Sequence, residues 1–204
     1  MCSSDLPPSA ALANGTAAHA LDFDDQPDPA RAHVSCVMLP ALLATAEDAA
    51  PVSGARFLLA FALGGELQVR LGEACPDSLR TGWHPTMTFG TLGASVGAGS
   101  LLGLDGAGLR NALGMGFHQT GGSAQSMRDG VLSKRLGPGF AARSAVLAAF
   151  LAADGLTGTR RPLEGNAGLF RLYERDAVNP ALVSAGWGER WSLGAVSFKP
   201  YPCC

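Results

Sequence analysis

Charged and aromatic residues are scarce in this sequence, at 16% and 7% of its 204 residues, whereas hydrophobic residues make up 47%. A chain of this length and composition buries a sizeable core, so we do not expect extended disorder. The formal net charge is only -2, which provides no strong field toward nucleic acid or an anionic membrane. Every apolar stretch is interrupted before it reaches the roughly 18 residues of a membrane span. We therefore expect neither a nucleic-acid partner nor a membrane span.

Cysteines with the spacing of a metal or redox motif are also absent. The five cysteines form no C-x-x-C, and two of them, Cys203 and Cys204, are adjacent. An odd number without such spacing argues against a disulfide framework and against a thiolate metal site. The first residues lack the basic and apolar regions of a secretory signal. We therefore predict reduced thiols and no bound metal in a cytoplasmic protein.

The signatures of several enzyme classes are missing as well. The sequence contains no G-x-S-x-G, no H-E-x-x-H and no G-x-G-x-x-G, and it lacks the G-x-x-x-x-G-K-[ST] order of a P-loop. These absences disfavour serine hydrolases, zinc proteases and proteins that bind dinucleotides or nucleotides through these motifs.

Small residues and helical periodicity are what the chain has in abundance. Its 27 glycines, together with many alanines, predict helices that approach closely through small side chains. Apolar spacing predicts helices over residues 10–23, 34–49, 54–74 (capped by Ser53), 86–102, 106–120 (capped by Asp105), 140–154 and 162–175. Residues 191–201 have the pattern of extended chain. The predicted fold class is therefore all-α, with seven or eight helices.

The predicted domain organisation has three parts. The helical domain covers residues 7–195, and residues 196–204 are expected to begin a crossing into a further domain. The opening residues 1–6, M-C-S-S-D-L, are expected to be a non-native leader.

Reactive side chains gather in four places, all at predicted helix ends or in predicted loops. The first is an acidic run at the end of the helix over residues 10–23, which contains Asp22 and is followed by His33. A helix C-terminus is unfavourable for negative charge because it carries the negative end of the macrodipole. The run therefore favours a functional role over a merely solvated helix end. Asp22 and His33 can meet only if the loop between them folds back.

The other three places are each open to a structural interpretation. His84 lies between a Trp and a Pro just before a helix, which suits a structural histidine as well as a functional one. The glycine-bounded loop over residues 126–137 is either solvated or an anion site at a helix start. Its cations are Arg128, Lys134 and Arg135. Lys199 has prolines close by that restrict the backbone and would aim the side chain reproducibly.

Five ordered blocks resemble the MmgE/PrpD family of enzymes from about residue 10 onward. They are N-G-x-A-x-H-x-x-D-F-D-D, W-H-P-T, S-K-R-L-G-P-G-F-A-A, L-E-G-x-x-G-L-F and F-K-P-Y-P-C-C. The resemblance implies a large helical domain joined to a smaller α/β lid domain, with the active site between them. It implies that this chain holds the helical domain and that the lid domain is missing. It further implies a homodimer that uses neither a metal nor an organic cofactor.

The resemblance also implies which residues form the site. The family's active-site acid corresponds to Asp22, its two histidines to His33 and His84, and its two lysines to Lys134 and Lys199. A polycarboxylate needs cations that hold it and that stabilise enolate-like charge. The lysines supply these, with Arg128 or Arg135, while the carboxylate and imidazoles move protons. Gln26 is a further predicted substrate-binding residue.

The resemblance implies a dehydratase-like lyase acting on a small polycarboxylate such as 2-methylcitrate. Members of the decarboxylase type place a Thr directly after D-F-D-D, where Gln26 stands here, and this difference disfavours decarboxylation. The alternatives are an isomerase, epimerase or decarboxylase of the same family, a non-catalytic helical binding module and a metal-dependent hydro-lyase. Because family chains are much longer, we expect the 204-residue chain alone to be inactive.

Overall fold

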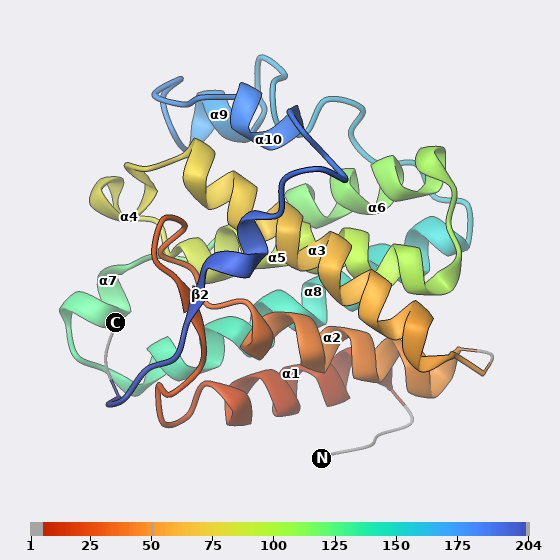
Figure 1. The fold of residues 1–204 in the computed structure, drawn as a ribbon, viewed down its shortest axis with the longest axis horizontal. Coiled ribbons are helices and arrows are strands. Elements are labelled where there is room, and N and C mark those ends of the chain that lie inside the picture. The colour runs from red at the N-terminus through yellow and green to blue at the C-terminus, as the bar shows by residue number, and fades with distance from the viewer. Residues whose placement is uncertain (1–5, 50, 203–204) are drawn as a thin grey trace.

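The computed structural model describes residues 6–49 and 51–202. Over these residues the regular secondary structure is helical apart from one two-stranded ribbon and an isolated bridge between Trp83 and Ser123 (Figure 1). The predicted all-α class is confirmed. The long helices are α1 (Pro7–Ala18), α2 (Ser35–Asp48), α3 (Gly54–Ala74), α5 (Pro85–Leu102), α6 (Gly106–Gln119) and α8 (Gly137–Ala153). The short elements are β1 (Gln26–Pro27), α4 (Ser78–Thr81), α7 (Gln125–Arg128), η1 (Leu132–Leu136), α9 (Leu169–Leu172), α10 (Ala181–Ser184), η2 (Ser192–Ala195) and β2 (Val196–Ser197).

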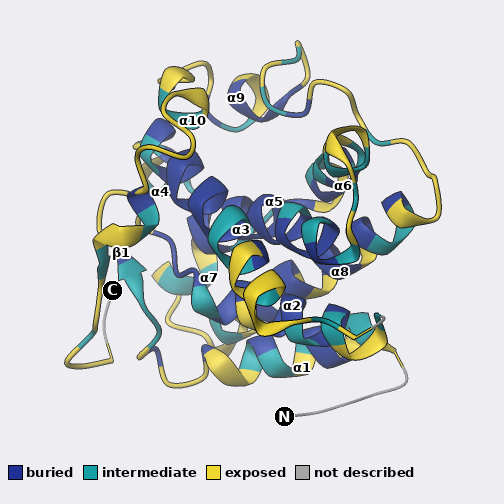
Figure 2. Ribbon diagram, turned by 45° about the vertical axis from the view of Figure 1, so that its right-hand side comes forward, coloured by how far each residue is buried: buried dark blue, intermediate teal, exposed yellow. Residues whose placement is uncertain are grey.

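Helices α5 and α8 lie at the centre of the fold. Helix α5 packs against α2, α3, α6 and α8, and α8 also packs against α1, α2 and α6. Most residues of α5 are buried (Figure 2). A Cβ atom on Gly93 of α5 would lie 2.4 Å from the carbonyl oxygen of Gly64 in α3, and one on Gly139 of α8 would lie 2.4 Å from that of Leu12 in α1. The predicted close approach through small residues is therefore confirmed at these two crossings.

The segment over residues 132–153 is long and apolar enough to cross a membrane by length and composition alone. In the fold, 61% of its 18-residue apolar window is buried. Core packing of α8 against four other helices accounts for this composition.

Local sequence signals predicted two helix starts. The Ser53 hydroxyl accepts a hydrogen bond from the backbone N–H of Arg56 at the start of α3. The Asp105 carboxylate accepts one from the backbone N–H of Gly108 at the start of α6. Both predicted caps are confirmed, and each satisfies a backbone donor that the helix itself leaves unpaired.

Two predicted helices differ from the structure. The helix over residues 10–23 ends at Ala18, because the chain turns at His19 and then enters the left-handed region at Asp22. Within residues 162–175 only α9 is helical. A Cβ atom on Gly165 would lie 2.6 Å from the carbonyl oxygen of Arg161, so the chain makes a tight turn there that excludes a continuous helix.

The C-terminal segment returns to the loop between α1 and α2. Strand β2 pairs antiparallel with β1 in that loop, with Gln26 opposite Ser197, and Figure 1 shows the two strands side by side. The predicted extended character of residues 191–201 is confirmed at β2, whereas η2 is a 3-10 helix. The ribbon brings Lys199 close to a loop that lies far from it in sequence.

The described cysteines, Cys36 and Cys75, are free and buried. Cys2, Cys203 and Cys204 lie outside the described residues, as do residues 1–5 of the predicted leader.

Candidate active site

The site is built on the loop that joins α1 to α2. Asp22 has a φ of 59°, in the left-handed region that Asp adopts more readily than most residues. Its carboxylate turns inward, and the residue is only 8% exposed. The loop folds back, so that His33 Nε2 lies 3.9 Å from Asp22 Oδ1. The sequence left this fold-back open, and the structure places the two side chains together.

Both lysines of the chain meet on Asp22. Lys134 in η1 donates to Asp22 Oδ2, and Lys199 donates to Asp22 Oδ1 at 2.9 Å. The sequence contains no other lysine. Burial alone would raise the pKa of Asp22, but the hydrogen bonds and charges of the two lysines outweigh it and lower the pKa to about 2. At neutral pH Asp22 is therefore a carboxylate that holds two ammonium groups in one place.

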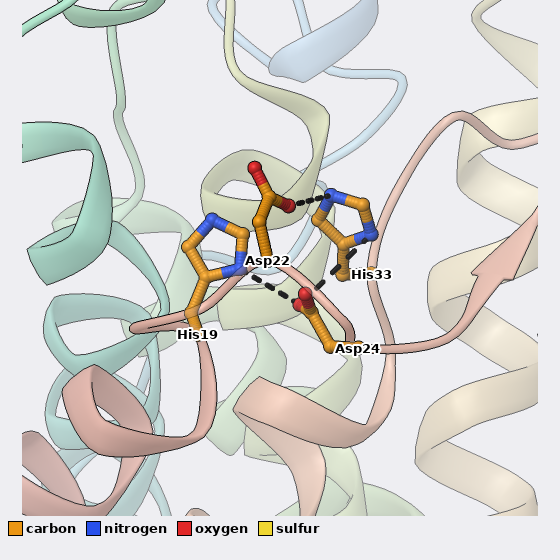
Figure 3. Close-up of side chains that lie close together, drawn as sticks. All are labelled: His19, Asp22, Asp24 and His33. Atoms are coloured by element: carbon orange, nitrogen blue, oxygen red, sulfur yellow. Dashed lines mark hydrogen bonds and ion pairs between the residues drawn. The ribbon is translucent and has the colours of Figure 1, made fainter. Parts of the chain in front are cut away.

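A second carboxylate, Asp24, lies beside the first and faces two imidazoles (Figure 3). His19 Nδ1 is 2.8 Å and His33 Nδ1 is 3.9 Å from Asp24 Oδ2. Burial would raise the pKa of Asp24, but the hydrogen bond with His19 and the charge of His33 hold it well below its usual range. The predicted site omits His19 and Asp24, although the acidic run after a helix was the signal for both.

His33 is held in one orientation by its neighbours. Its Nδ1 is 3.0 Å from the carbonyl oxygen of Asp25, which can only accept, so Nδ1 carries the proton and Nε2 presents a lone pair. The His33 backbone N–H donates to Thr86 Oγ1 at 3.0 Å, and Gln68 Nε2 donates to the His33 carbonyl at 2.7 Å. Burial lowers the pKa of His33, against the opposing charge of Asp24. The lone pair of Nε2 thus faces the side of Asp22.

His84 is the N-cap residue of α5 and is 5% exposed. Its backbone N–H donates to the carbonyl of Gly122 at 2.9 Å. The preceding Trp83 stacks on Tyr173 with ring centroids 4.1 Å apart and donates to the Tyr173 carbonyl. Burial, reinforced by the nearby His19, His33 and Lys134, lowers the pKa of His84 to about 3. The His84 imidazole is therefore neutral at pH 7.

A cavity of about 320 Å³ opens beside the two imidazoles. Its lining residues are Gln26, Asp28, Arg31, His33, Leu79, His84, Pro85, Thr86 and Met127. The predicted substrate-binding residue Gln26 therefore lies on this cavity. Arg31 is a cation on the lining that the predicted site omits. Its φ of 50° is unusual for a residue other than Gly, and no pattern in the sequence signals it.

The two predicted substrate-binding arginines do not line the cavity. Arg135 Nη1 donates to the carbonyl oxygens of His19 and Ala20, at 3.3 and 2.8 Å, and so ties η1 to the end of α1. Arg128 is exposed at the end of α7, next to Met127, which does line the cavity. Substrate binding by Arg128 and Arg135 stays a prediction.

Four of these side chains also have the chemistry of metal ligands. His19, Asp22, Asp24 and His33 offer one ligand atom each, and these atoms all lie within 4.8 Å of one another. Both carboxylate oxygens of Asp22 already accept from lysine ammonium groups. A divalent cation would have to compete with these two ammonium groups for the same lone pairs.

Several known proteins are similar in sequence to this chain. Cis-aconitate decarboxylase of Homo sapiens is 37% identical over 206 residues, which are 97% of this chain and 42% of that protein. The cis-aconitate decarboxylase-like protein oryM of Aspergillus oryzae is 32% identical over 97% of this chain and 44% of its own length. Cis-aconitate decarboxylase of Aspergillus terreus is 31% identical, with 97% and 43% covered. The chain thus spans less than half the length of these relatives. The family model of the MmgE/PrpD N-terminal domain matches residues 4–180, and the chain belongs to the MmgE/PrpD family.

Proposed function

We propose that this site serves a lyase reaction on a small polycarboxylate. We expect the reaction in a longer protein that contains this chain and has about the length of the relatives. The observation that carries the proposal is the meeting of Lys134 and Lys199 on the carboxylate of Asp22. Two buried ammonium groups at one carboxylate form a compact cationic centre, which suits a substrate with several carboxylates. The cavity lined by His33 and His84 adjoins this centre.

The acidic and basic groups of the site pair with one another. Asp22 and Asp24 are ionised, since both have lowered pKa values, and the two lysine side chains are 12% and 5% exposed. The carboxylates therefore balance the lysines while no substrate is present. A carboxylate of the substrate either replaces Asp22 as the partner of one ammonium group or binds that ammonium group together with Asp22. In both cases the negative charge of the substrate lies beside fixed cations.

The lysines and histidines then have different parts in the reaction. Breaking a C–C or C–H bond next to a carboxylate leaves an electron pair that spreads into an enolate-like system, and the ammonium groups of Lys134 and Lys199 stabilise that charge. His33 and His84 are the groups that move protons, because the lone pair of His33 Nε2 is available and both side chains line the cavity. Asp22, with a pKa of about 2, is a weak base that positions the lysines.

Decarboxylation of a tricarboxylate of the cis-aconitate type is the leading reaction despite Gln26 at the position after D-F-D-D, because the similar proteins bear that activity in their names. The C–C bond to one carboxyl group breaks, carbon dioxide leaves, and the electron pair stays on the allylic carbon. A proton from solvent, relayed to the carbon through His33 or His84, then completes the product.

Dehydration of a citrate-type acid is the second candidate. It requires two proton transfers, one from carbon and one to the leaving hydroxyl, and two imidazoles on one cavity can provide both. Gln26 also lies on the lining and offers an amide to a hydroxyl or carboxylate.

The test uses the longest natural protein that contains this chain. Incubation with cis-aconitate and separately with 2-methylcitrate, followed by proton NMR in D₂O, distinguishes the reactions. Decarboxylation gives a product one carbon shorter with deuterium at the protonated carbon, and dehydration gives an alkene tricarboxylate. Deuterium exchange that leaves the carbon skeleton of the substrate unchanged indicates an isomerase or epimerase. Binding of either acid without any turnover refutes the lyase proposal and favours a non-catalytic binding module. Homodimerisation and a cytoplasmic location stay predictions.

A further inference from the structure

A buried ion pair on α3 holds the segment that leads to Lys199. Arg70 and Glu66 are both fully buried, and Arg70 Nε donates to Glu66 Oε1 at 2.5 Å. The guanidinium also donates to three backbone carbonyls of the C-terminal segment. They are those of Ala185 at 2.5 Å, Gly186 at 3.3 Å and Arg190 at 2.7 Å. Most of the hydrogen bonds that Arg70 donates therefore go to a segment more than 100 residues away in sequence.

Glu66 binds the same segment from the other side of the pair. Its Oε1 accepts from the backbone N–H of Ser192 at 3.0 Å, and its Oε2 accepts from that of Leu193 at 2.8 Å. These donors lie in η2, which directly precedes β2. Glu66 therefore binds backbone N–H groups of the segment, and Arg70 binds its backbone carbonyl groups. These charged hydrogen bonds fix the path of the segment over α3.

The segment then runs a short way to Lys199. Ser197 of β2 is paired with Gln26, and Lys199 follows two residues later and donates to Asp22 at 2.9 Å. Lys199 lies six positions after Leu193, a reach of at most about 22 Å when fully extended. The ribbon that bridges this distance has only two residues in each strand. Such a short pairing is marginal by itself, so the anchor on α3 limits where Lys199 can go.

We infer that Glu66 and Arg70 are positioning residues that hold Lys199 on Asp22 by fixing the C-terminal segment on α3. The lysine is one of the two cations of the proposed lyase site, so the importance of this role for turnover rests on the proposed function. Lys134 reaches Asp22 from η1 along a separate path and does not depend on this anchor.

Simple stabilisation of α3 does not account for the pair. A buried ion pair can be replaced by apolar side chains of similar volume with little or no loss of stability. Arg70 and Glu66 instead direct five hydrogen bonds to the backbone of one segment. An apolar pair would keep the helix packed but would leave those backbone groups unanchored.

The two lysines provide a direct test on the 204-residue chain. Their acylation rates are measured separately by mass spectrometry with an amine-reactive reagent. In Glu66→Met/Arg70→Met we expect Lys199 to react about tenfold faster or more, since a hydrogen bond to a charged group is lost. Lys134 is the internal control, and its rate is expected to stay within about twofold, a small free-energy change. Far-UV circular dichroism confirms that the helices remain.

A second variant tests the anchor without touching the ion pair. Ser192→Pro removes one backbone N–H from which Glu66 accepts a hydrogen bond. Ser192 is the first residue of η2, a position where proline is tolerated. The preceding Trp191 is already extended, as a residue before proline prefers. Ser192→Ala is its matched control, because it keeps that N–H. Faster labelling of Lys199 in the proline variant, with Lys199 unchanged in the alanine variant, supports the inference.

Two outcomes overturn the inference. In the first, Lys199 reacts as slowly in both anchor variants as in the unaltered chain. In the second, Lys134 and Lys199 become faster by the same factor, which indicates a general loosening. The labelling does not involve turnover. A protein that decarboxylates or dehydrates neither acid but labels selectively at Lys199 therefore refutes the proposed function and keeps the positioning role.

Discussion

Replacement of Asp22 by Asn removes the negative charge between the two lysines with little change of shape. Asn tolerates the left-handed backbone at this position about as well as Asp does. The substitution therefore isolates the charge from the backbone conformation. The amide oxygen can still accept from one lysine, but the other ammonium group loses its partner.

The expected magnitude follows from the pKa of Asp22. Its pKa falls from 3.8 to about 2 in the folded protein, and each pKa unit corresponds to about 1.4 kcal/mol. The ionised side chain therefore stabilises the fold by about 2 kcal/mol at pH 7. Because the folded pKa is the lower one, this stabilisation is fully present well above pH 4 and is lost as the pH falls through 2. Roughly half of it remains at pH 3.

The assay is urea unfolding of the unaltered chain and of Asp22→Asn, at pH 7 and at pH 3. We expect the variant to be less stable by about 2 kcal/mol at pH 7 and by about 1 kcal/mol at pH 3. At pH 7 the melting temperature should fall by about 4–8 °C for a chain of this size. Asp48→Asn, at an exposed carboxylate, is the control and should change little. A difference between the two proteins that is the same at both pH values, or absent at pH 7, refutes the assigned charge network.

Two further predictions concern His84 and the helix packing. His84 has a pKa of about 3 in the folded protein, against an ordinary value of 6.5. Between pH 3 and pH 6.5 the imidazole is therefore protonated in the unfolded chain but not in the folded one, and stability rises with pH over this range. His84→Gln should flatten this dependence in unfolding measurements, and the His84 imidazole NMR signals should not titrate between pH 5 and 8; a titration near 6.5 contradicts the assignment. Gly139→Ala should destabilise the fold by roughly 1–3 kcal/mol through overpacking against α1, whereas Gly54→Ala, with nothing within 4 Å of the added Cβ, should be neutral or slightly stabilising. Equal effects in urea unfolding would contradict the close approach of α8 and α1.

The long helices could be predicted because their signals are local. Ser53 and Asp105 mark helix starts by hydrogen bonds to backbone groups three residues away, and apolar spacing marks the bodies. The helix predicted over residues 162–175 failed because the turn at Gly165 depends on a close backbone approach that periodicity does not encode. The pairing of β1 with β2 joins residues far apart in sequence, and no short-range pattern signals it.

The candidate site was likewise predictable only in part. Asp22, His33, His84 and the two lysines lie in blocks with recognisable residue order, and the structure brings Asp22, His33, Lys134 and Lys199 within 4 Å contacts. The anchor formed by Glu66 and Arg70 was not predicted. On a helix read by its apolar spacing, a Glu and an Arg four residues apart resemble an ordinary surface pair. Only their complete burial shows otherwise.

The central claim is that the lysines gathered on Asp22 serve a lyase reaction on a polycarboxylate. The most direct measurement compares the turnover number for cis-aconitate of the longest natural protein containing this chain with that of its Lys199→Met variant. Loss of one group that stabilises developing negative charge is expected to lower kcat by about 10²-fold or more. Turnover by the unaltered protein that survives Lys199→Met with less than about tenfold loss, or no turnover of cis-aconitate or 2-methylcitrate at all, contradicts the claim.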